Sequence, residues 1–360
     1  MTQTDDSGLA ADDPNRIVTV LEPEDEYPHE PDDASNYNES MYLNAFDLGL
    51  EAGGWFRLGN RVNEGYAEMS VCIYLPDGRV GFMFDRPAIE TNAEMAAGGL
   101  RIDVVEPFEH LRVTYEGKVC LLDEPGDMAN PRQAFRDNPF VSASVELDYR
   151  GVSPMYGGKP QYADGREIEM DPEKSFAKAH YEQHCSVTGT ITVGDPDGTP
   201  ESAPTVFEID GLGLRDKSWG PRFWQALTWY RWLPMVFDED FAMMLSVIDR
   251  GEGQEPRRSG MVLVGDEYHQ IVDCDVDAVW DDKGEQTTMR CVARTADREY
   301  EITGEVLSMI PLRNRRTTPD GDQLVTRITE AMTRYTCDGR VGMGMSEYLD
   351  QVVDGRPIGP

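Results

Sequence analysis

The chain is 360 residues long, carries a formal net charge of −34 at pH 7, and contains 39% hydrophobic and 9% aromatic residues. At about 150 residues per domain this length predicts two domains, and the ordinary hydrophobic content excludes a disordered chain. Because so acidic a protein repels phosphate backbones and anionic lipids, we expect neither a nucleic-acid partner nor insertion into a membrane, and a hydrophobic small molecule remains as the expected ligand.

The first 35 residues are acidic and contain several prolines, so we predict a flexible arm over 1–35. This arm lacks the basic and apolar regions of a secretory signal, and no apolar run in the chain reaches the ~20 residues of a membrane helix. We therefore expect a cytoplasmic protein. Only six of the 33 basic residues are lysine. An acidic, lysine-poor composition is typical of halophiles, and a GC-rich coding sequence produces the same bias.

Short alternating segments begin near Gly65. The segments "YAEMSVCIYL" and "RVGFMFDRP" flank the turn residues Pro76, Asp77 and Gly78, which predicts a β-hairpin. Pro131 begins the one short helix that we expect here, because proline favours the first helical position. Further strands are predicted at 100–105, 110–115, 118–122 and 141–149.

A connection rich in Gly, Pro and Asp at 151–174 separates these strands from a second set that starts near Ala179. We place the boundary there, between an N-terminal β domain over 36–178 and a C-terminal β domain over 179–360. Both halves contain many short alternating segments and few helical stripes. The sequence therefore predicts an all-β protein built from antiparallel sandwiches or barrels.

Six cysteines and five histidines are scattered along the chain without the paired spacing of a metal site, so no metal is expected. The cysteines are interpreted as reduced, buried thiols. The sequence contains no GxSxG elbow, P-loop or HExxH motif, and "GLGLRD" lacks the spacing and βαβ context of a dinucleotide site. We therefore expect no cofactor.

The segment 211–232, "GLGLRDKSWGPRFWQALTWYRW", is the most promising place for chemistry. In an extended strand, alternation sends Lys217 and Trp219 to one face and Asp216 to the other. An aspartate that faces a dry, tryptophan-rich interior keeps its proton toward neutral pH, as a general acid requires. Alternatively, Asp216 forms a structural salt bridge with Arg215 or Arg222 while the tryptophans fill the core.

Four of the six tryptophans lie in this segment, which is too many for one packing layer: Trp219, Trp224, Trp229 and Trp232. Some of them are expected to line a cavity, where indole faces stabilise a cation or form flat apolar walls. Arg231, between aromatic residues, either anchors a carboxylate or carbonyl group or extends its charge to solvent.

The segment "HYEQHC" places two histidines close together. Alternation puts Glu182 and His184 on the polar face of the predicted strand. That face is either a barrel lumen that holds an acid/base pair or a surface in contact with solvent.

Four segments resemble one known superfamily. "GLGLRDKSWGPRFW" resembles the Asp-His-x-Trp-Gly signature of the carotenoid hydratase (hydroxyneurosporene synthase) and AttH-like superfamily, especially its bacterial branch with "RDHSWGPR". "NESMYLNAFDLGLEAGGWFRLGNRVNEG", "HYEQHCSVTG" and "GRVGMGMSEYLDQV" are similar to the same branch, so the likeness extends over nearly everything after residue 36. The resemblance implies two lipocalin-like antiparallel β-barrels side by side, with an apolar ligand cavity.

The resemblance also implies roles for single residues. It implies that Asp216 protonates an alkene with the help of Trp219, whereas Lys217 replaces the family's histidine. A lysine is cationic at neutral pH and cannot simply take over the proton shuttle of an imidazole.

We therefore predict a cofactor-independent lyase or isomerase that hydrates, rearranges or cyclises a large apolar substrate such as an isoprenoid, a steroid or a polyketide. The catalytic candidates are Asp216, Trp219 and Lys217. The substrate-binding candidates are Arg222, Trp224, Trp229, Arg231, Glu182 and His184. The alternative is a non-catalytic lipid or terpenoid carrier that uses the same cavity, and a third possibility is a structural protein whose aromatic run is fully packed.

Overall fold

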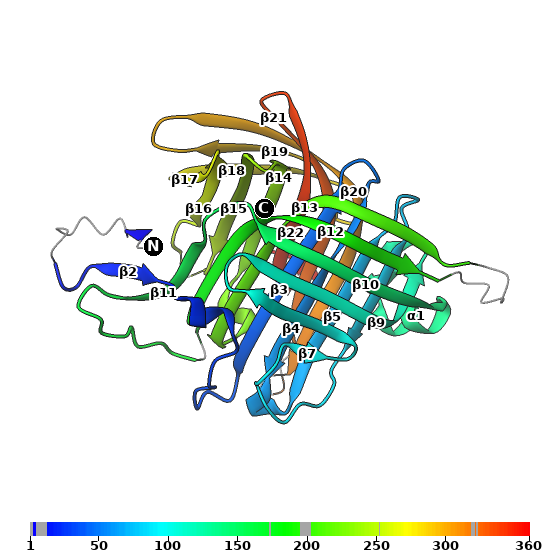
Figure 1. The fold of residues 1–360 in the computed structure, drawn as a ribbon, viewed down its shortest axis with the longest axis horizontal. Helices are drawn as coiled ribbons and strands as arrows, with labels where there is room; N and C mark the ends of the chain where they lie inside the picture. Colours follow the sequence, from blue (N-terminus) through cyan, green and yellow to red (C-terminus); the bar gives the residue numbers. More distant parts are fainter. Residues whose placement is uncertain are drawn as a thin grey trace.

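The computed structural model describes residues 3–4, 13–172, 174–194, 203–251, 253–317, 321 and 323–360. These residues form two large antiparallel β-sheets with a few short helical segments (Figure 1), which confirms the prediction of an all-β, lipocalin-like fold. The alternation that predicted the strands is visible in β10 (Phe140–Gly151), where Val141, Leu147 and Tyr149 are among the alternate residues that are buried.

Among the described residues the first sheet has 13 strands: β1 (Gln3–Thr4), β2 (Ile17–Val20), β3 (Tyr37–Asp47), β4 (Ala52–Arg61), β5 (Tyr66–Tyr74), β6 (Val80–Asp85), β7 (Ala96–Ala97), β8 (Leu100–Glu106), β9 (His110–Leu122), β10, β11 (Tyr156–Tyr162), β12 (Ala179–Val193) and β13 (Thr205–Pro221). The short helices are η1 (Pro23–Glu26), η2 (Val62–Glu64), η3 (Pro125–Ala129), α1 (Pro131–Asp137) and η4 (Trp224–Ala226). The expected hairpin is β5–β6, and the expected helix is α1.

Eight strands of this sheet close into a barrel in the order β12-β13-β3-β4-β5-β6-β9-β10, because β10 pairs with both β9 and β12. An eight-stranded barrel is just wide enough for side chains to fill. Here the filling is apolar and includes Leu43, Phe56, Val71 and Leu147, all with no accessible surface. The interior of this barrel is therefore a core.

The second sheet contains ten strands among the described residues: β14 (Trp229–Asp238), β15 (Phe241–Asp249), β16 (Arg257–Val264), β17 (Glu267–Ile271), β18 (Asp273–Trp280), β19 (Gln286–Arg294), β20 (Glu299–Thr317), β21 (Gln323–Cys337), β22 (Arg340–Val353) and β23 (Arg356–Pro357). Its strand order is β17-β16-β15-β14-β22-β21-β20-β19-β18, with β23 paired to β22. Its concave side encloses a second apolar core that includes Leu233, Tyr335 and Tyr348.

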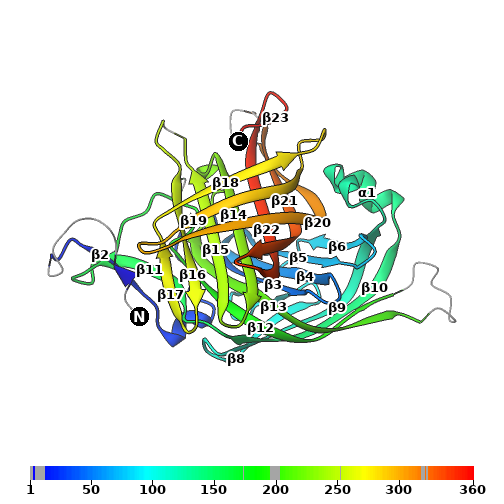
Figure 2. The ribbon, with the colours of Figure 1, turned by 90° about the horizontal axis from the view of Figure 1, so that it is seen from above.

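The second sheet packs against the outside of the first barrel (Figure 2). Phe46 and Trp55 on the outer face of the barrel share a cluster with Met332 and Met345 of the second sheet. As a result every residue of β3 is buried, on both faces of the strand. Polar side chains on this shared face are removed from bulk water, which is the condition under which their pKa values shift.

The two sheets divide the chain later than the predicted domain boundary at 178/179. Strands β12 and β13 lie in the first barrel, where β12 pairs with β10 and β13 pairs with β3, so the second sheet begins only at Trp229. The segment "RDKSWGPR" therefore belongs to the first sheet. The connection that suggested a boundary leads back into the same barrel, and local composition does not reveal such a return.

The predicted flexible arm is attached along its described part. Glu26 is fully buried and forms an ion pair with Arg215, with 2.5 Å between Oε2 and Nη1. Residues 1, 2 and 5–12 of the arm lie outside the described residues. Proline and acidic residues predicted mobility here, but the side chain of Glu26 and the backbone carbonyl groups of Asp25 and Tyr27 instead contact buried cations of the barrel.

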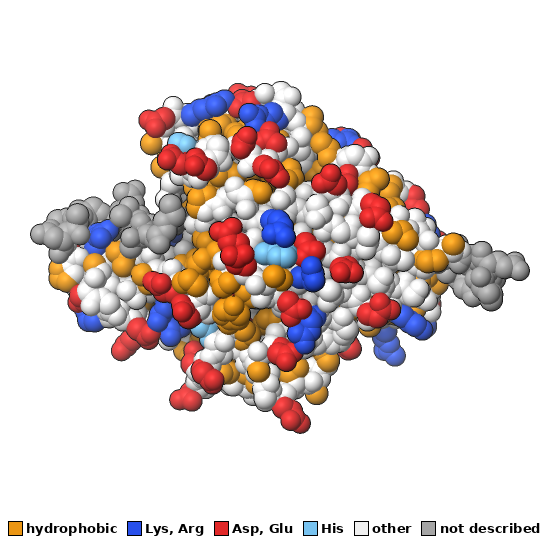
Figure 3. Space-filling view, viewed as in Figure 1, with side chains coloured by type: hydrophobic (Ala, Val, Ile, Leu, Met, Phe, Trp, Pro, Cys, Tyr) orange, Lys and Arg blue, Asp and Glu red, His pale blue; other side chains and the backbone are white. Residues whose placement is uncertain are grey.

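The composition of the chain also led to expectations about the cysteines, the charged side chains and membrane-spanning helices. All six cysteines are buried and free. Figure 3 shows acidic side chains spread over the visible face, with basic side chains beside many of them. Within the described part of the chain, no helix has the length and apolar character needed to cross a membrane.

Candidate active site

The candidate site starts from the alternation of β13, which places Asp216 on the outer face of the barrel and Lys217 on the inner side. On the neighbouring strand, Glu182 is the register partner of Asp216, and His180 lies two residues before it on the same face. His180 Nε2 is hydrogen-bonded to the carboxylate of Asp216 and lies 3.7 Å from Glu182 Oε1. Strand pairing thus brings one imidazole and two carboxyl groups together.

The second sheet completes this cluster from the opposite side. Trp232 of β14 donates a hydrogen bond of 2.8 Å from Nε1 to Glu182 Oε1. The hydroxyl of Tyr230, on the same strand, donates to the carboxyl group of Glu347 on β22. We use the name inter-sheet site for the seven residues His180, Glu182, Asp216, Arg222, Tyr230, Trp232 and Glu347.

Burial and neighbouring charges raise the pKa values of two acids of this site, Glu182 and Glu347, toward neutral pH. Burial raises the pKa of Glu182 to about 7; the charge of His180 opposes this shift and that of Asp216 adds to it. Burial, followed by the charge of Asp216, raises the pKa of Glu347 to about 8. Burial lowers the pKa of His180, but the charge and hydrogen bond of Asp216 outweigh it and raise the pKa to about 9. At pH 7 His180 is therefore protonated and Glu347 is a neutral acid.

The cluster is open to solvent at His180 and closed at Glu182. Burial is the largest influence on the pKa of His180, so the imidazole is surrounded by protein. Its side chain is nevertheless 47% accessible, so solvent reaches the ring. Glu182, by contrast, has no accessible surface. The apolar side chains beside the cluster are Phe176, Trp224, Trp232, Ile248 and Leu312, which are partly buried and pack on Tyr230 and Leu349. The polar cluster thus adjoins an apolar wall.

The end of β13 positions Arg222. Gly220 has φ = +105°, a conformation that favours glycine, and a Cβ there would lie 2.4 Å from Lys178 Cβ. Pro221 then ends the strand, and the chain returns so that Arg222 Nη2 donates a 2.7 Å hydrogen bond to Ser218 Oγ. The glycine and proline of "SWGPR" therefore serve to fold this arginine back over the strand.

Several buried polar atoms in and beside the inter-sheet site have no hydrogen-bond partner. They include Glu182 Oε2, Arg222 Nε, Trp224 Nε1 and Arg57 Nη2. Buried polar groups in native proteins are nearly always satisfied by protein, water or ligand. A concentration of such atoms in one place therefore indicates where a polar ligand group or ordered water binds.

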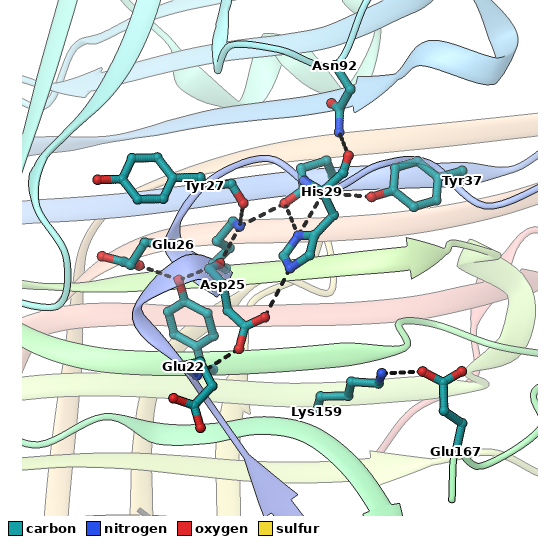
Figure 4. Close-up of polar contacts among 12 residues, drawn as sticks. Glu22, Asp25, Glu26, Tyr27, His29, Tyr37, Asn92, Lys159 and Glu167 are labelled. Carbon is teal, nitrogen blue, oxygen red and sulfur yellow. Dashed lines mark hydrogen bonds and ion pairs between the residues drawn. The ribbon is translucent and has the colours of Figure 1, made fainter. Parts of the chain in front are cut away.

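Lys217 and Trp219 lie on the other side of the barrel wall. Lys217 Nζ is 2.8 Å from Glu39 Oε1 and donates to the carbonyl oxygens of Asp25 and Tyr27 at 2.6 and 2.8 Å. Figure 4 shows the segment that contains Asp25, Tyr27 and His29, whose polar groups converge. The ring of His29 stacks on Trp219, with 4.1 Å between ring centroids. Both predicted catalytic residues thus hold the N-terminal segment and do not face Asp216.

Two further predicted residues lie inside the second sheet. Arg231 Nη2 is 3.0 Å from Asp350 Oδ1, and its guanidinium lies 5.2 Å from the ring of Trp229. Alternation along β14 turns Trp229 and Arg231 into the second core, whereas Tyr230 and Trp232 face the first barrel. The sequence identified the aromatic segment but not which of its residues share a face.

His184 connects the two sheets. Its Nδ1 is 2.9 Å from Tyr268 Oη and its Nε2 is 3.2 Å from the carbonyl oxygen of Met243. Burial lowers the pKa of His184 to about 4, so the ring is neutral at pH 7. Of the predicted residues, the structure thus gathers Asp216, Glu182, Arg222 and Trp224, while His184 ties the sheets together.

Sequence reasoning missed His180, Tyr230 and Glu347. The signal for His180 was present, because it lies two residues before Glu182 and so shares a strand face with it. The signal was incomplete without the pairing of β12 with β13. Glu347 is 131 positions from Asp216, and no local pattern relates them.

The same group offers ligand atoms to a cation: one from each of His180, Glu182 and Asp216, all within 4.8 Å of one another. A metal requires a deprotonated imidazole. Here the pKa of His180 is about 9 and the positive charge of Arg222 acts on the same ring, which opposes binding of a cation. The donor set fits proton transfer better than metal coordination.

Grooves of about 300 and 510 Å³ lie elsewhere. The first is lined by residues that include Pro125 and Leu307, and the second by residues that include Thr288 and Arg334. Neither contains a residue of the inter-sheet site. The inter-sheet site is therefore identified by its chemistry and not by the size of a groove.

The fold and the site together define a lipocalin-like β protein of two sheets with an acid–base cluster between them. A family model described as "Domain of unknown function (DUF7064)" matches residues 22–352, and the chain belongs to this family. No functionally curated protein matches the sequence.

Solved structures with a similar fold cover almost the whole chain. A structure of CghA with Sch210972 has a TM-score of 0.53 and 11% identity, covering 97% of this chain and 98% of the other. Kievitone hydratase from Nectria haematococca has a TM-score of 0.52 and 7% identity, covering 92% of both chains. A protein assigned as AttH (NE1406) from Nitrosomonas europaea has a TM-score of 0.53 and 11% identity, covering 97% and 99%. This likeness concerns the fold and agrees with the AttH-like resemblance; membership of the "RDHSWGPR" branch stays a prediction.

Proposed function

We propose that the protein is a lyase or isomerase that acts on an apolar small molecule by proton transfer at the inter-sheet site. The observation that carries this proposal is the contact between His180 and Asp216 beside Glu182, next to a group of partly buried apolar side chains. One protein with a similar fold, kievitone hydratase, is named for a reaction of this class, which supports the proposal.

Addition of water to a double bond needs one proton delivered to carbon and one removed from water. In our proposal the protonated His180 donates to the alkene carbon, the π electron pair forms the new C–H bond, and the adjacent carbon becomes positive. Water attacks this carbon and loses its proton to the carboxylate of Glu182. The proton then returns to His180 across the 3.7 Å between Glu182 Oε1 and His180 Nε2. The same two groups move a proton between carbons in an isomerisation.

Asp216, the acid suggested by the sequence, acts in this scheme together with His180. Its negative charge keeps the imidazole protonated at neutral pH and holds the ring in place. The indole of Trp232 and the phenol of Tyr230 lie beside the cluster and are suited to stabilise a developing positive charge.

The test compares Asp216→Asn and His180→Gln with the unaltered protein. Each is incubated with fractions of apolar metabolites, and products that have gained one water, or changed structure at equal mass, are sought by mass spectrometry and NMR. We expect product from the unaltered protein and a loss of at least 100-fold in both variants. A matched control is His110→Gln, because His110 Nε2 also contacts an aspartate, Asp148 Oδ1, at 2.6 Å but outside the inter-sheet site.

Full activity of Asp216→Asn would refute the proposed mechanism. Saturable quenching of tryptophan fluorescence by an apolar ligand, with no product from any fraction, would instead support the carrier function. The apolar wall with partly buried Phe176 and Trp224 is compatible with either outcome, so turnover is the deciding measurement.

A further inference from the structure

We infer that the ligand of the inter-sheet site carries an anionic oxygen group, such as a carboxylate or an enolate, and that this group binds at Arg222. The inference deepens the proposed function and rests on it for the position of the reacting carbon. Binding of the acid itself can be measured without turnover.

Arg222 is a buried cation without a carboxylate partner. The residue is only 8% exposed, and none of the described acidic side chains lies within 4.0 Å of its guanidinium. Its one side-chain hydrogen bond goes to the hydroxyl of Ser218, and its Nε has no partner. Burial of an unpaired charge is strongly unfavourable, so an anion that binds there recovers a large electrostatic energy.

Other buried arginines of the chain are paired. Arg215 contacts Glu26 at 2.5 Å, and Arg231 contacts Asp350 at 3.0 Å. The fold thus supplies carboxylates to its structural arginines. The absence of such a partner at Arg222 is a property of this position and not of buried arginines in this protein.

Aromatic rings hold the guanidinium of Arg222 in place. Its Cζ lies 4.1 Å from the ring centroid of Phe176 and 5.3 Å from that of Trp224. A second guanidinium, that of Arg57, lies 5.7 Å from the same Trp224 ring. Arg57 Nη1 is 3.4 Å from Glu68 Oε2, but its Nη2 has no partner. Burial, and then the charge of Arg57, lower the pKa of Arg222.

The unpartnered buried atoms around Trp224 include three donors, Arg222 Nε, Arg57 Nη2 and Trp224 Nε1, beside the unpartnered amide of Gln225. Guanidinium and indole N–H groups have no acceptor capacity, so only an acceptor can satisfy them. Carboxylate and enolate oxygens accept several such bonds, and planar guanidinium groups favour a carboxylate.

The charges of Asp216 and Glu68 act on Arg222 from a distance, but no described carboxyl group pairs with it directly. Asp216 is engaged by His180, and Glu347, whose pKa is raised to about 8 by burial, is protonated at pH 7. The charges of Arg57 and Arg222 both act to lower the pKa of Glu347, so the two cations lie close to the proton-transfer cluster. An acid bound at Arg222 would therefore extend its apolar part along the wall and place a neighbouring carbon near His180.

The test uses two probes of nearly equal size, 1-pyrenebutyrate and 1-pyrenebutanol, and follows fluorescence during titration at pH 7. We expect the acid to bind the unaltered protein at least tenfold more tightly than the alcohol. In Arg222→Gln the affinity for the acid should fall at least tenfold, to that of the alcohol, whose affinity should not change.

Thermal unfolding of the same variants separates ligand binding from a structural role. Because Arg222 has no carboxylate partner, Arg222→Gln should unfold at the same temperature as the unaltered protein or higher. The control Arg231→Gln should lower the unfolding temperature and keep the preference for the acid. If Arg231→Gln does not fold, Arg112→Gln, which removes an ion pair to Asp148 at the barrel surface, is the second control.

Equal affinity of the unaltered protein for the two probes overturns the inference, as does absence of saturable binding of the acid, or a preference that survives in Arg222→Gln. A preference for the acid that depends on Arg222, in a protein that gives no product from any substrate fraction, overturns only the proposed catalysis. If the protein turns over neutral substrates but shows no preference for the acid probe, this inference is overturned and the proposed catalysis stands.

Discussion

Removal of the Lys217 charge tests whether this residue is structural or catalytic. Lys217 and Glu39 are 1% and 0% exposed, and Nζ to Oε1 is 2.8 Å. In Lys217→Met the carboxylate of Glu39 loses this cation, and the carbonyl oxygens of Asp25 and Tyr27 lose a donor. Breaking a buried ion pair from one side costs about 3–5 kcal/mol, because the remaining charge stays buried.

The expected change in melting temperature follows from this energy. Unfolding entropy is about 2.1 cal/mol/K per residue, so for 360 residues a loss of about 4 kcal/mol lowers the midpoint by about 5 °C. Calorimetry measures this shift. Adding Glu39→Gln to Lys217→Met removes the carboxylate charge that the lysine no longer compensates. We expect this double variant to recover about 2 kcal/mol of the lost free energy of unfolding.

Activity provides the other half of this test. Because Lys217 faces away from Asp216, Lys217→Met should retain the turnover and acid binding of the unaltered protein below its melting temperature. If Lys217→Met is as stable as the unaltered protein, the structural role of Lys217 is refuted. If the variant is folded but inactive, Lys217 returns to the catalytic candidates.

Three predictions concern pH. The pKa of Glu182 is about 7 and that of His180 about 9, so kcat/KM should rise as Glu182 ionises near pH 7 and fall as His180 loses its proton near pH 9; a flat profile contradicts the proton-transfer scheme. In Asp216→Asn, NMR titration of the His180 ring should show its pKa below 9 because the carboxylate charge is gone. Burial raises the pKa of Glu330 from 4.5 to about 8, so the folded state retains a proton that the unfolded state loses. Its contribution to stability is therefore complete below pH 4.5 and is lost as pH rises toward 8; Glu330→Gln should flatten the decline in melting temperature between pH 6 and 9, and an unchanged slope argues against this origin.

The sequence by itself determined the local structure. Hydrophobic alternation and turn residues predicted the β5–β6 hairpin, the strand at Val141–Tyr149 and the opposite orientations of Asp216 and Lys217, and all three are present. These features have a period of two residues or a fixed turn chemistry, so neighbours in the chain are sufficient to set them.

Only the tertiary structure decided which of these faces meet. His180 lies beside Asp216 because β12 pairs with β13, and Glu347 joins them because the second sheet packs on the outside of the barrel. Pairing between distant strands also placed Arg231 in the second core and left Arg222 without a carboxylate. Strand register and sheet packing depend on contacts across the whole chain, and when both faces of a strand are buried, alternation no longer tells a core face from a functional one.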